Sequence, residues 1–351
     1  MKRLVILCDG TWNTPDETKD GIPVPTNVVK LAEAVLDTHN GIPQIVFYDS
    51  GIGASGSLIK RGYDGATGTG ISANIQRAYR FLIDRFEVGD EIFLFGFSRG
   101  AFTARSLAGL IRNCGILRRS AFDVVPQAYA LYRSRRPATH PTEREATLFR
   151  RTYAVEDVTP ITFIGVWDTV GSLGNPLYFG GISPRNRFHD TDLSSYVKFA
   201  YHALAVDETR RKFTPTLWHQ QPNASRQILE QRWFPGVHSN VGGGYPDVGL
   251  SDLALSWLAT KAKQAGLGLV PVPLAANPTG ALMNSRTGFY RLVPKRYRSI
   301  DAPMAGGHTN ETIDESVLTR FQSDSSYRPP NLVDYLRRNP AMLGSTMVGS
   351  A

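Results

Sequence analysis

The chain has 351 residues, of which 42% are hydrophobic and 20% are charged, an ordinary balance for a folded globular protein. The length fits one enlarged domain, and such a chain can bury a substantial core without disulfides or structural metals. The formal net charge is +8, but no helix-turn-helix, zinc or RNA-recognition signature accompanies it. We therefore expect no nucleic-acid partner.

The first predicted element is a short apolar run, Leu4–Cys8, which follows two basic residues. Secretory signal peptides begin in the same way, but this run stops at Asp9, is too short and lacks a cleavage site. It predicts instead a strand that is buried on both faces. Because no run is long enough to span a membrane, we expect a cytoplasmic protein, and export by a secretion system without a signal stays open. Cys8 and Cys114 are expected to be small buried hydrophobes in a reducing compartment.

Apolar strand-like runs then alternate with amphipathic helix-like runs. The further expected strands are Ile45–Tyr48, Ile92–Phe97, Ile161–Trp167 and Ile228–Trp233. The expected helices are Asn27–Leu36, Ile71–Phe86, Ala101–Ile111, Tyr196–Val206 and Ser251–Ala265. This alternation predicts an α/β fold in which helices cover both faces of a mostly parallel sheet. We assign residues 1–330 to a single domain with cap-forming insertions at 115–155 and 171–195, and residues 331–351 to a C-terminal tail.

The most informative motif is Gly96-Phe97-Ser98-Arg99-Gly100, which matches G-x-S-x-G. It lies between the expected strand Ile92–Phe97 and the expected helix Ala101–Ile111. A strand, a sharp turn and a helix in this order form the nucleophile elbow of α/β-hydrolases, which exposes the serine hydroxyl above the edge of the sheet. The motif therefore predicts that Ser98 is a catalytic nucleophile, because the flanking glycines permit the tight, strained turn.

A serine nucleophile needs a general base, and that base needs an orienting carboxylate. In this fold the acid and then the histidine follow the serine along the chain. Asp168 ends the strand Ile161–Trp167, so it is our candidate for the acid, with Asp207 and Glu208 as competitors that are expected to pair with arginines instead.

The base is predicted to be His238, which follows the strand Ile228–Trp233 and precedes three glycines, residues 242–244. Its rival is His202, which lies within the expected helix Tyr196–Val206, where a structural role is more natural. His238 is preferred because it completes the chain order of serine, acid and histidine.

An oxyanion hole and a substrate pocket are expected around this triad. The amide of Arg99, at the N-terminus of the helix, is one predicted oxyanion donor. The amides of Gly10 and Thr11, after the first strand, are candidates for the second, although Asp9–Asn13 can equally be an ordinary turn. By position alone, four aromatic residues are expected to line an acyl pocket: Trp12, Phe97, Phe102 and Tyr178.

A glycine-rich segment offers a competing interpretation. Residues 51–56 match G-x-G-x-x-G after a strand, which would indicate a dinucleotide site if a helix followed at once. Further glycines interrupt residues 57–70, so we expect a loop over the site, with nucleotide binding as an alternative. No P-loop motif and no metal-ligand spacing is present, so we expect neither a cofactor nor a catalytic metal.

Basic residues gather in three clusters: Arg133, Arg135 and Arg136; Arg210, Arg211 and Lys212; Lys295, Arg296 and Arg298. The clusters indicate either a solvated surface or attraction to anionic lipid headgroups or polymers. Transient contact with an anionic membrane surface is therefore an open possibility.

Four motifs in this order, around Asp9, Ser98, Asp168 and His238, resemble an α/β-hydrolase family long catalogued as a domain of unknown function. Its best understood relatives are the catalytic domains of bacterial type VI secretion phospholipase effectors. The resemblance covers roughly residues 1–330 and implies the same three catalytic residues and activity on glycerophospholipid esters. The chain departs from the family at Asn240, where an aspartate is usual, and we expect it to lack the large region that effectors carry for membrane docking.

These observations predict a serine hydrolase that cleaves carboxylic esters through an acyl-enzyme, with lipids or phospholipids as the leading substrates. A short-chain or polyester esterase, or an amidase, is the alternative within enzymes. A catalytically silent binding module on a hydrolase fold is the alternative of another class. The sequence leaves the oligomeric state open.

Overall fold

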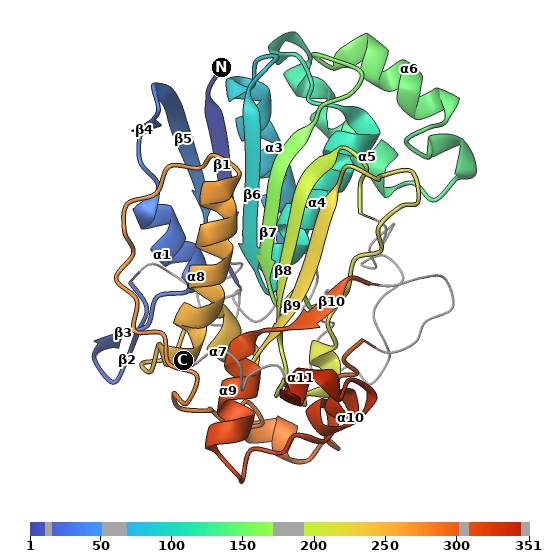
Figure 1. Ribbon diagram of the computed structural model, residues 1–351. Helices are drawn as coiled ribbons and strands as arrows, with labels where there is room; N and C mark the ends of the chain where they lie inside the picture. Colours follow the sequence, from blue (N-terminus) through green and yellow to red (C-terminus); the bar gives the residue numbers. More distant parts are fainter. Residues whose placement is uncertain (11–15, 51–68, 171–192, 302–308, 345–351) are drawn as a thin grey trace.

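The computed structural model describes residues 1–10, 16–50, 69–170, 193–301 and 309–344. Within these ranges an eight-stranded sheet forms the centre of the molecule, in the order β10-β9-β8-β7-β6-β1-β5-β4 (Figure 1). All neighbouring strands are parallel except the edge strand β4, which is antiparallel to β5. The strands are β1 (Arg3–Cys8), β4 (Thr38–His39), β5 (Ile42–Asp49), β6 (Glu91–Phe97), β7 (Ile161–Trp167), β8 (Val197–Ala205), β9 (Ile228–Phe234) and β10 (Glu311–Ile313).

Helices cover both faces of this sheet, as predicted. On one face, α1 (Asn27–Ala34) and α8 (Gly249–Gln264) pack on a core cluster that includes Phe95 and Trp167. On the other face, α3 (Thr69–Arg85) and α4 (Arg99–Cys114) pack on a second cluster around Leu94 and Ile164. In the described part of the chain, no helix is both long enough and apolar enough to cross a bilayer. The two-faced burial explains why the central strands read as continuous apolar runs.

One predicted helix is wrong. Residues Tyr196–Val206 do not form a helix, because Val197–Ala205 make up β8, which pairs with β7 on one side and β9 on the other. A central strand that is buried on both faces shows no alternation, and its apolar residues also fit a helical stripe. The other predicted strands and helices are confirmed, each within a few residues of its expected bounds.

The insertion expected at residues 115–155 is helical, but it lies away from the carboxyl ends of the strands. It contains η1 (Arg119–Val124), α5 (Val125–Arg133), η2 (Pro137–Thr139) and α6 (Arg144–Tyr153). Arg150 of α6 donates to the carbonyl of Asn113 over 3.1 Å, at the far end of α4 from Ser98. The insertion therefore packs at the opposite end of the sheet from the predicted nucleophile (Figure 1).

The C-terminal third contains structure that the sequence pattern did not predict. After η5 (Gly288–Arg291), strand β10 extends the sheet and is followed by α9 (Glu315–Ser323), α10 (Pro330–Arg338) and α11 (Ala341–Gly344). Leu332, Tyr335 and Leu336 of α10 are buried in a third core cluster with Trp233. The tail expected from residue 331 onward therefore begins with a packed helix. The remaining short elements are β2 (Thr18–Lys19), β3 (Ile22–Pro23), η4 (Arg211–Phe213) and α7 (His238–Gly242).

Both cysteines are free thiols inside the protein. Cys8 ends β1 and is 1% exposed, and Cys114 ends α4 and is fully buried. Burial raises the pKa of each thiol above its ordinary value. The prediction that both behave as small buried hydrophobes is confirmed.

Candidate active site

Ser98 lies in a sharp turn between β6 and α4. Its backbone has φ 57° and ψ −119°, a conformation that strains any residue other than glycine. A Cβ atom on Gly100 would lie 2.0 Å from the carbonyl oxygen of Cys8, and one on Gly96 would lie 2.5 Å from the carbonyl oxygen of Gly100. Both glycines are therefore required, because α4 begins directly against the ends of β6 and β1.

The sheet register places Asp168 beside Ser98. Phe97 and Trp167 are register partners in β6 and β7, so the residues that follow them leave the sheet side by side. The amide of Ser98 donates to the carbonyl of Trp167 over 3.1 Å, and the amide of Asp168 donates to the carbonyl of Ala203 over 2.8 Å. Asp168 also has a positive φ of 40°, which marks a second strained turn at the same edge.

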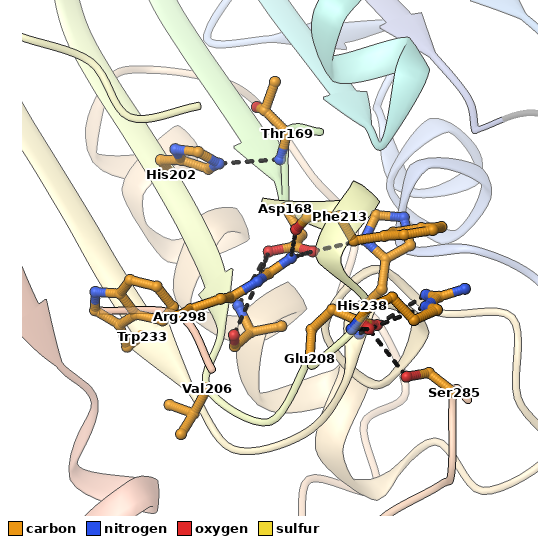
Figure 2. Close-up of polar contacts among 12 residues, drawn as sticks. Asp168, Thr169, His202, Val206, Glu208, Phe213, Trp233, His238, Ser285 and Arg298 are labelled. Atoms are coloured by element: carbon orange, nitrogen blue, oxygen red, sulfur yellow. Dashed lines mark hydrogen bonds and ion pairs between the residues drawn. The ribbon is translucent and has the colours of Figure 1, made fainter. Parts of the chain in front are cut away.

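His238 pairs with Asp168 and packs beside the residue that precedes Ser98. It is the first residue of α7, and its Nδ1 lies 2.5 Å from Oδ2 of Asp168 (Figure 2). Its imidazole packs on the ring of Phe97, the residue before Ser98, with the ring centroids 4.7 Å apart. Asp168 is fully buried and His238 is 5% exposed. The structure thus brings the three residues predicted from the sequence to one edge of the sheet.

Arg298 is an important residue of this site that the sequence analysis did not assign to it. Its guanidinium donates to Oδ1 of Asp168 over 2.6 Å and to Oδ2 over 3.0 Å. It also donates to the carbonyls of Ala205 and Phe213, at 2.9 Å and 2.5 Å (Figure 2). The side chain is 3% exposed, so this planar, two-point pairing takes place out of contact with water.

These contacts set the protonation states of the site. Burial alone would raise the pKa of Asp168, but Arg298 and His238 outweigh it and hold that pKa well below its usual range. Burial lowers the pKa of His238 below its ordinary value, and the hydrogen bond to Asp168 offsets part of this effect. At neutral pH the site therefore holds an ionised carboxylate beside a neutral imidazole.

The competing acids serve as structural supports. Glu208 forms an ion pair with Arg210 at 2.8 Å, as expected, and also accepts the backbone amide of His238 at 3.3 Å. Asp207 accepts the amide of Gly236 and the hydroxyl of Tyr327, at 2.7 Å and 2.8 Å. Burial raises the pKa of Asp207 to about 6. Neither carboxylate has a described hydrogen bond to the imidazole of His238, although both hold the turn that carries it.

The rival base, His202, lies inside the sheet. Its Nε2 accepts the amide of Thr169 at 3.0 Å, and its Nδ1 lies 3.2 Å from Oε1 of Gln231. The protein thus occupies both ring nitrogens, which indicates a structural role. Among the described residues, neither this histidine nor His238 belongs to a group of three or more His, Cys, Asp or Glu side chains that could hold a metal ion.

Only part of the predicted oxyanion hole lies among the described residues. Arg99 is the first residue of α4, so its backbone amide lies in the first turn of the helix, directly after Ser98. The amide of Gly10 donates to the carboxylate of Asp9 over 2.6 Å, so in this arrangement it is already engaged. Thr11, the other candidate donor, falls outside the described residues.

The predicted substrate-binding residues are divided in the same way. Phe97 is 2% exposed and packs on His238, and Phe102 is 7% exposed within the core on the α4 side of the sheet. Trp12, Tyr178 and the glycine-rich segment up to residue 68 fall outside the described residues. The two described rings therefore support the base and the nucleophile helix.

Asn240 helps to hold the histidine turn. Its Oδ1 accepts the amides of Val237 and Met283 at 3.3 Å and 3.2 Å, and its Nδ2 donates to the carbonyl of Ala281 over 3.1 Å. An aspartate can accept the first two hydrogen bonds but cannot donate the third. Asparagine therefore ties the histidine turn to the segment near residue 281.

The family model for the catalytic domain of Tle1-like phospholipase effectors of the type VI secretion system matches residues 2–261. The chain belongs to this family. The matched region contains Ser98, Asp168 and His238, whereas Arg298 lies beyond it. Membership of the Tle1-like family implies a hydrolase, and the mostly parallel sheet with helices on both faces is an α/β-hydrolase-like fold.

The chain is also similar to a curated protein and to solved structures. An uncharacterized protein of Saccharomyces cerevisiae is 30% identical over 240 residues, which are 63% of this chain and 33% of the yeast protein. An uncharacterized Pseudomonas aeruginosa protein is 18% identical, with a TM-score of 0.48, over 79% of this chain and 47% of its own. The Tle1 effector bound to the VgrG spike is 20% identical, with a TM-score of 0.39, over 70% and 52%. The chain thus spans about a third of the yeast protein and about half of each solved chain.

Proposed function

We propose that this chain is a serine hydrolase that cleaves carboxylic esters of lipids, with glycerophospholipids as the leading substrate class. One observation carries the proposal. His238 is hydrogen-bonded to an ionised, fully buried Asp168 at the sheet edge where Ser98 occupies a strained turn. This is the arrangement by which a weak hydroxyl nucleophile is activated. Membership of a phospholipase effector family favours a lipid ester as the substrate.

In the proposed mechanism each group has a distinct task. Asp168 holds the Nδ1–H of His238, which leaves Nε2 to accept the proton of Ser98 as its oxygen attacks the ester carbonyl. The amide of Arg99 stabilises the oxyanion, and one such donor is worth roughly 10²–10³ in rate. His238 then protonates the leaving alcohol, and water attacks the acyl-enzyme to release the acid and regenerate Ser98.

The electrostatics of the site support this assignment. Because burial lowers the pKa of His238, the imidazole is neutral and able to accept a proton at neutral pH. Because Arg298 lowers the pKa of Asp168, the carboxylate stays ionised and can stabilise the imidazolium that forms. A short-chain or polyester esterase would use the same three residues, so these residues do not determine the length of the acyl chain.

The test compares wild type, Ser98→Ala and a control, Ser106→Ala, in which a buried serine inside α4 is changed. Each is assayed on p-nitrophenyl esters of increasing chain length and on mixed phospholipid vesicles. We expect Ser98→Ala to lower kcat by roughly 10⁴-fold or more, since the triad acts as a unit, and Ser106→Ala to retain activity. Equal turnover by Ser98→Ala and wild type would eliminate the nucleophile. Activity confined to short soluble esters would replace the lipid substrate by a small ester.

A further inference from the structure

The segment between residues 285 and 298 is attached to the candidate triad at both ends. At its start, the hydroxyl of Ser285 donates to Glu208 over 3.0 Å, and Glu208 in turn accepts the amide of His238. At its end, Arg298 is paired with Asp168. The two attachments appear together in Figure 2. The segment is therefore a loop whose two ends are fixed beside the catalytic acid and base.

Aromatic packing fixes the middle of this loop to the same site. The ring of Tyr290 meets the ring of Phe213 edge to face, with centroids 6.1 Å apart, and Phe213 meets His238 edge to face at 5.0 Å. The guanidinium of Arg210 lies 3.4 Å from the centroid of Phe213 and 5.4 Å from that of Tyr290. The inner face of the loop is thus a stack of rings and a cation that ends on the candidate base.

The outer face of the loop has a different character. Leu292 is 83% exposed, the highest value among the large hydrophobic side chains of the described residues. Arg291, Lys295 and Arg296 beside it are exposed as well, and no described salt bridge involves any of the three. The sequence from 286 to 297 contains no acidic residue. The loop therefore presents a protruding leucine with exposed basic side chains near it in the sequence.

A hollow next to the loop connects this face to the histidine turn. The cavity has a volume of about 830 Å³. Arg286, Arg291 and Lys295 line it from the loop, and Val237, the residue before His238, also lines it. An anionic headgroup in this cavity would lie among the cations of the loop and close to the candidate base.

We propose that residues 286–297 form the surface by which the protein docks on an anionic phospholipid bilayer. Leu292 enters the headgroup region, while Arg291, Lys295 and Arg296 contact lipid phosphates. A bilayer fits this face because a protruding leucine near exposed basic side chains matches an anionic interface with an apolar interior. The inference deepens the proposed function and rests on its lipid substrate, since docking here would bring lipid esters to the candidate triad.

The test measures vesicle binding separately from catalysis. Ser98→Ala protein is mixed with vesicles of phosphatidylcholine alone or of phosphatidylcholine with phosphatidylglycerol, and bound protein is measured by co-sedimentation. We expect stronger binding to the anionic vesicles. Adding Leu292→Ser should lower the partition coefficient about tenfold. Adding Lys295→Gln with Arg296→Gln should lower it about 25-fold on anionic vesicles, since each cation near such a surface contributes roughly fivefold.

Matched controls come from α6, at the opposite end of the sheet. Leu148→Ser changes another exposed leucine, and Arg144→Gln changes an exposed arginine on the same helix. Both should bind vesicles as the parent protein does. Equal binding by the loop variants and the parent, equal losses in the control variants, or no preference for anionic vesicles would overturn the proposal.

A second measurement separates docking from chemistry. In protein with Ser98 intact, Leu292→Ser should reduce hydrolysis of anionic vesicles about tenfold and leave hydrolysis of soluble p-nitrophenyl butyrate unchanged. Equal losses on both substrates would show that the leucine supports the site itself and would overturn the docking role. If Ser98→Ala retains full activity, the proposed catalytic serine fails, while the binding measurement still decides the docking surface.

Discussion

The surroundings of the two buried histidines show what distinguishes a candidate base from a structural residue. His202, in β8, and His238, at the start of α7, are both buried, and burial lowers the pKa of both. The partners of their ring nitrogens differ. Thr169 and Gln231 occupy both nitrogens of His202, whereas His238 uses Nδ1 for Asp168 and has no described hydrogen bond at Nε2. Burial and the direction of the pKa shift therefore do not distinguish a catalytic histidine from a structural one. The informative feature is Nε2 of His238, for which no hydrogen bond is described.

The largest expected effect comes from making the same substitution at both histidines. His238→Gln should lower kcat on a soluble ester by roughly 10⁴-fold, because it removes the proton acceptor. His202→Gln should instead lower the free energy of unfolding by about 1–3 kcal/mol, because buried hydrogen bonds are lost or distorted, with kcat of the folded protein nearly unchanged. Steady-state kinetics and urea denaturation of both variants measure the two effects. A comparable loss of kcat in both variants would break the comparison.

The next effect concerns Arg298. This arginine pairs directly with Asp168, the acid that is hydrogen-bonded to His238. Arg298→Gln leaves the buried Asp168 without its charge partner, so we expect a loss of about 3–5 kcal/mol in the free energy of unfolding. The uncompensated carboxylate should also raise the pKa of His238, so the acid limb of kcat/KM should move to higher pH. Arg298→Lys, which keeps the charge but loses the two-point geometry, should lie between. An unmoved acid limb in Arg298→Gln would show that the arginine only stabilises the fold.

The smallest effect is a pH dependence of stability that belongs to His202. Burial lowers its pKa to about 3 in the folded protein, against about 6.5 in the unfolded chain. Between these values the unfolded chain binds more protons, so wild-type stability from this group falls as the pH falls. The stability advantage of wild type over His202→Gln should shrink by about 2 kcal/mol from pH 7 to pH 5.

Asp207 titrates in the same range with the opposite sign. Its pKa is raised to about 6 by burial, so its protonation favours the folded state as the pH falls below that value. This contribution is present in wild type and in His202→Gln alike, and it cancels in their difference. Urea denaturation of the pair at both pH values is therefore the measurement, and a pH-independent difference would contradict the assignment.

The sequence predicts the sheet well wherever local pattern and three-dimensional burial agree. The glycines around Ser98 indicate the turn in the sequence. They are required there because no side chain fits between α4 and β1. The helix predicted over Val197–Ala205 is wrong because a strand that is buried on both faces has the same composition as a buried helix. The C-terminal helices were not predictable from local sequence, because the strands on which they pack, β8 and β9, lie far earlier in the chain.

The residues of the candidate site also differ in how well the sequence predicts them. Asp168 and His238 are predictable because each follows a recognisable strand, and strand ends meet at one edge of a parallel sheet. Arg298 lies 130 residues from Asp168 in a region without clear periodicity. Nothing local marks it among the 39 lysines and arginines of the chain. Grouping it with Lys295 and Arg296 as one surface cluster was wrong, because Arg298 is buried while its two neighbours are exposed.

The burial of both thiols has a practical consequence. Alkylating reagents attack the thiolate, and at Cys8 and Cys114 burial both blocks access and disfavours that form. The native protein therefore has a nearly silent background for maleimide labelling. A cysteine introduced at an exposed position such as Leu292 can carry an environment-sensitive fluorophore without removal of the native thiols, so that a change in its emission reports the polarity around the loop.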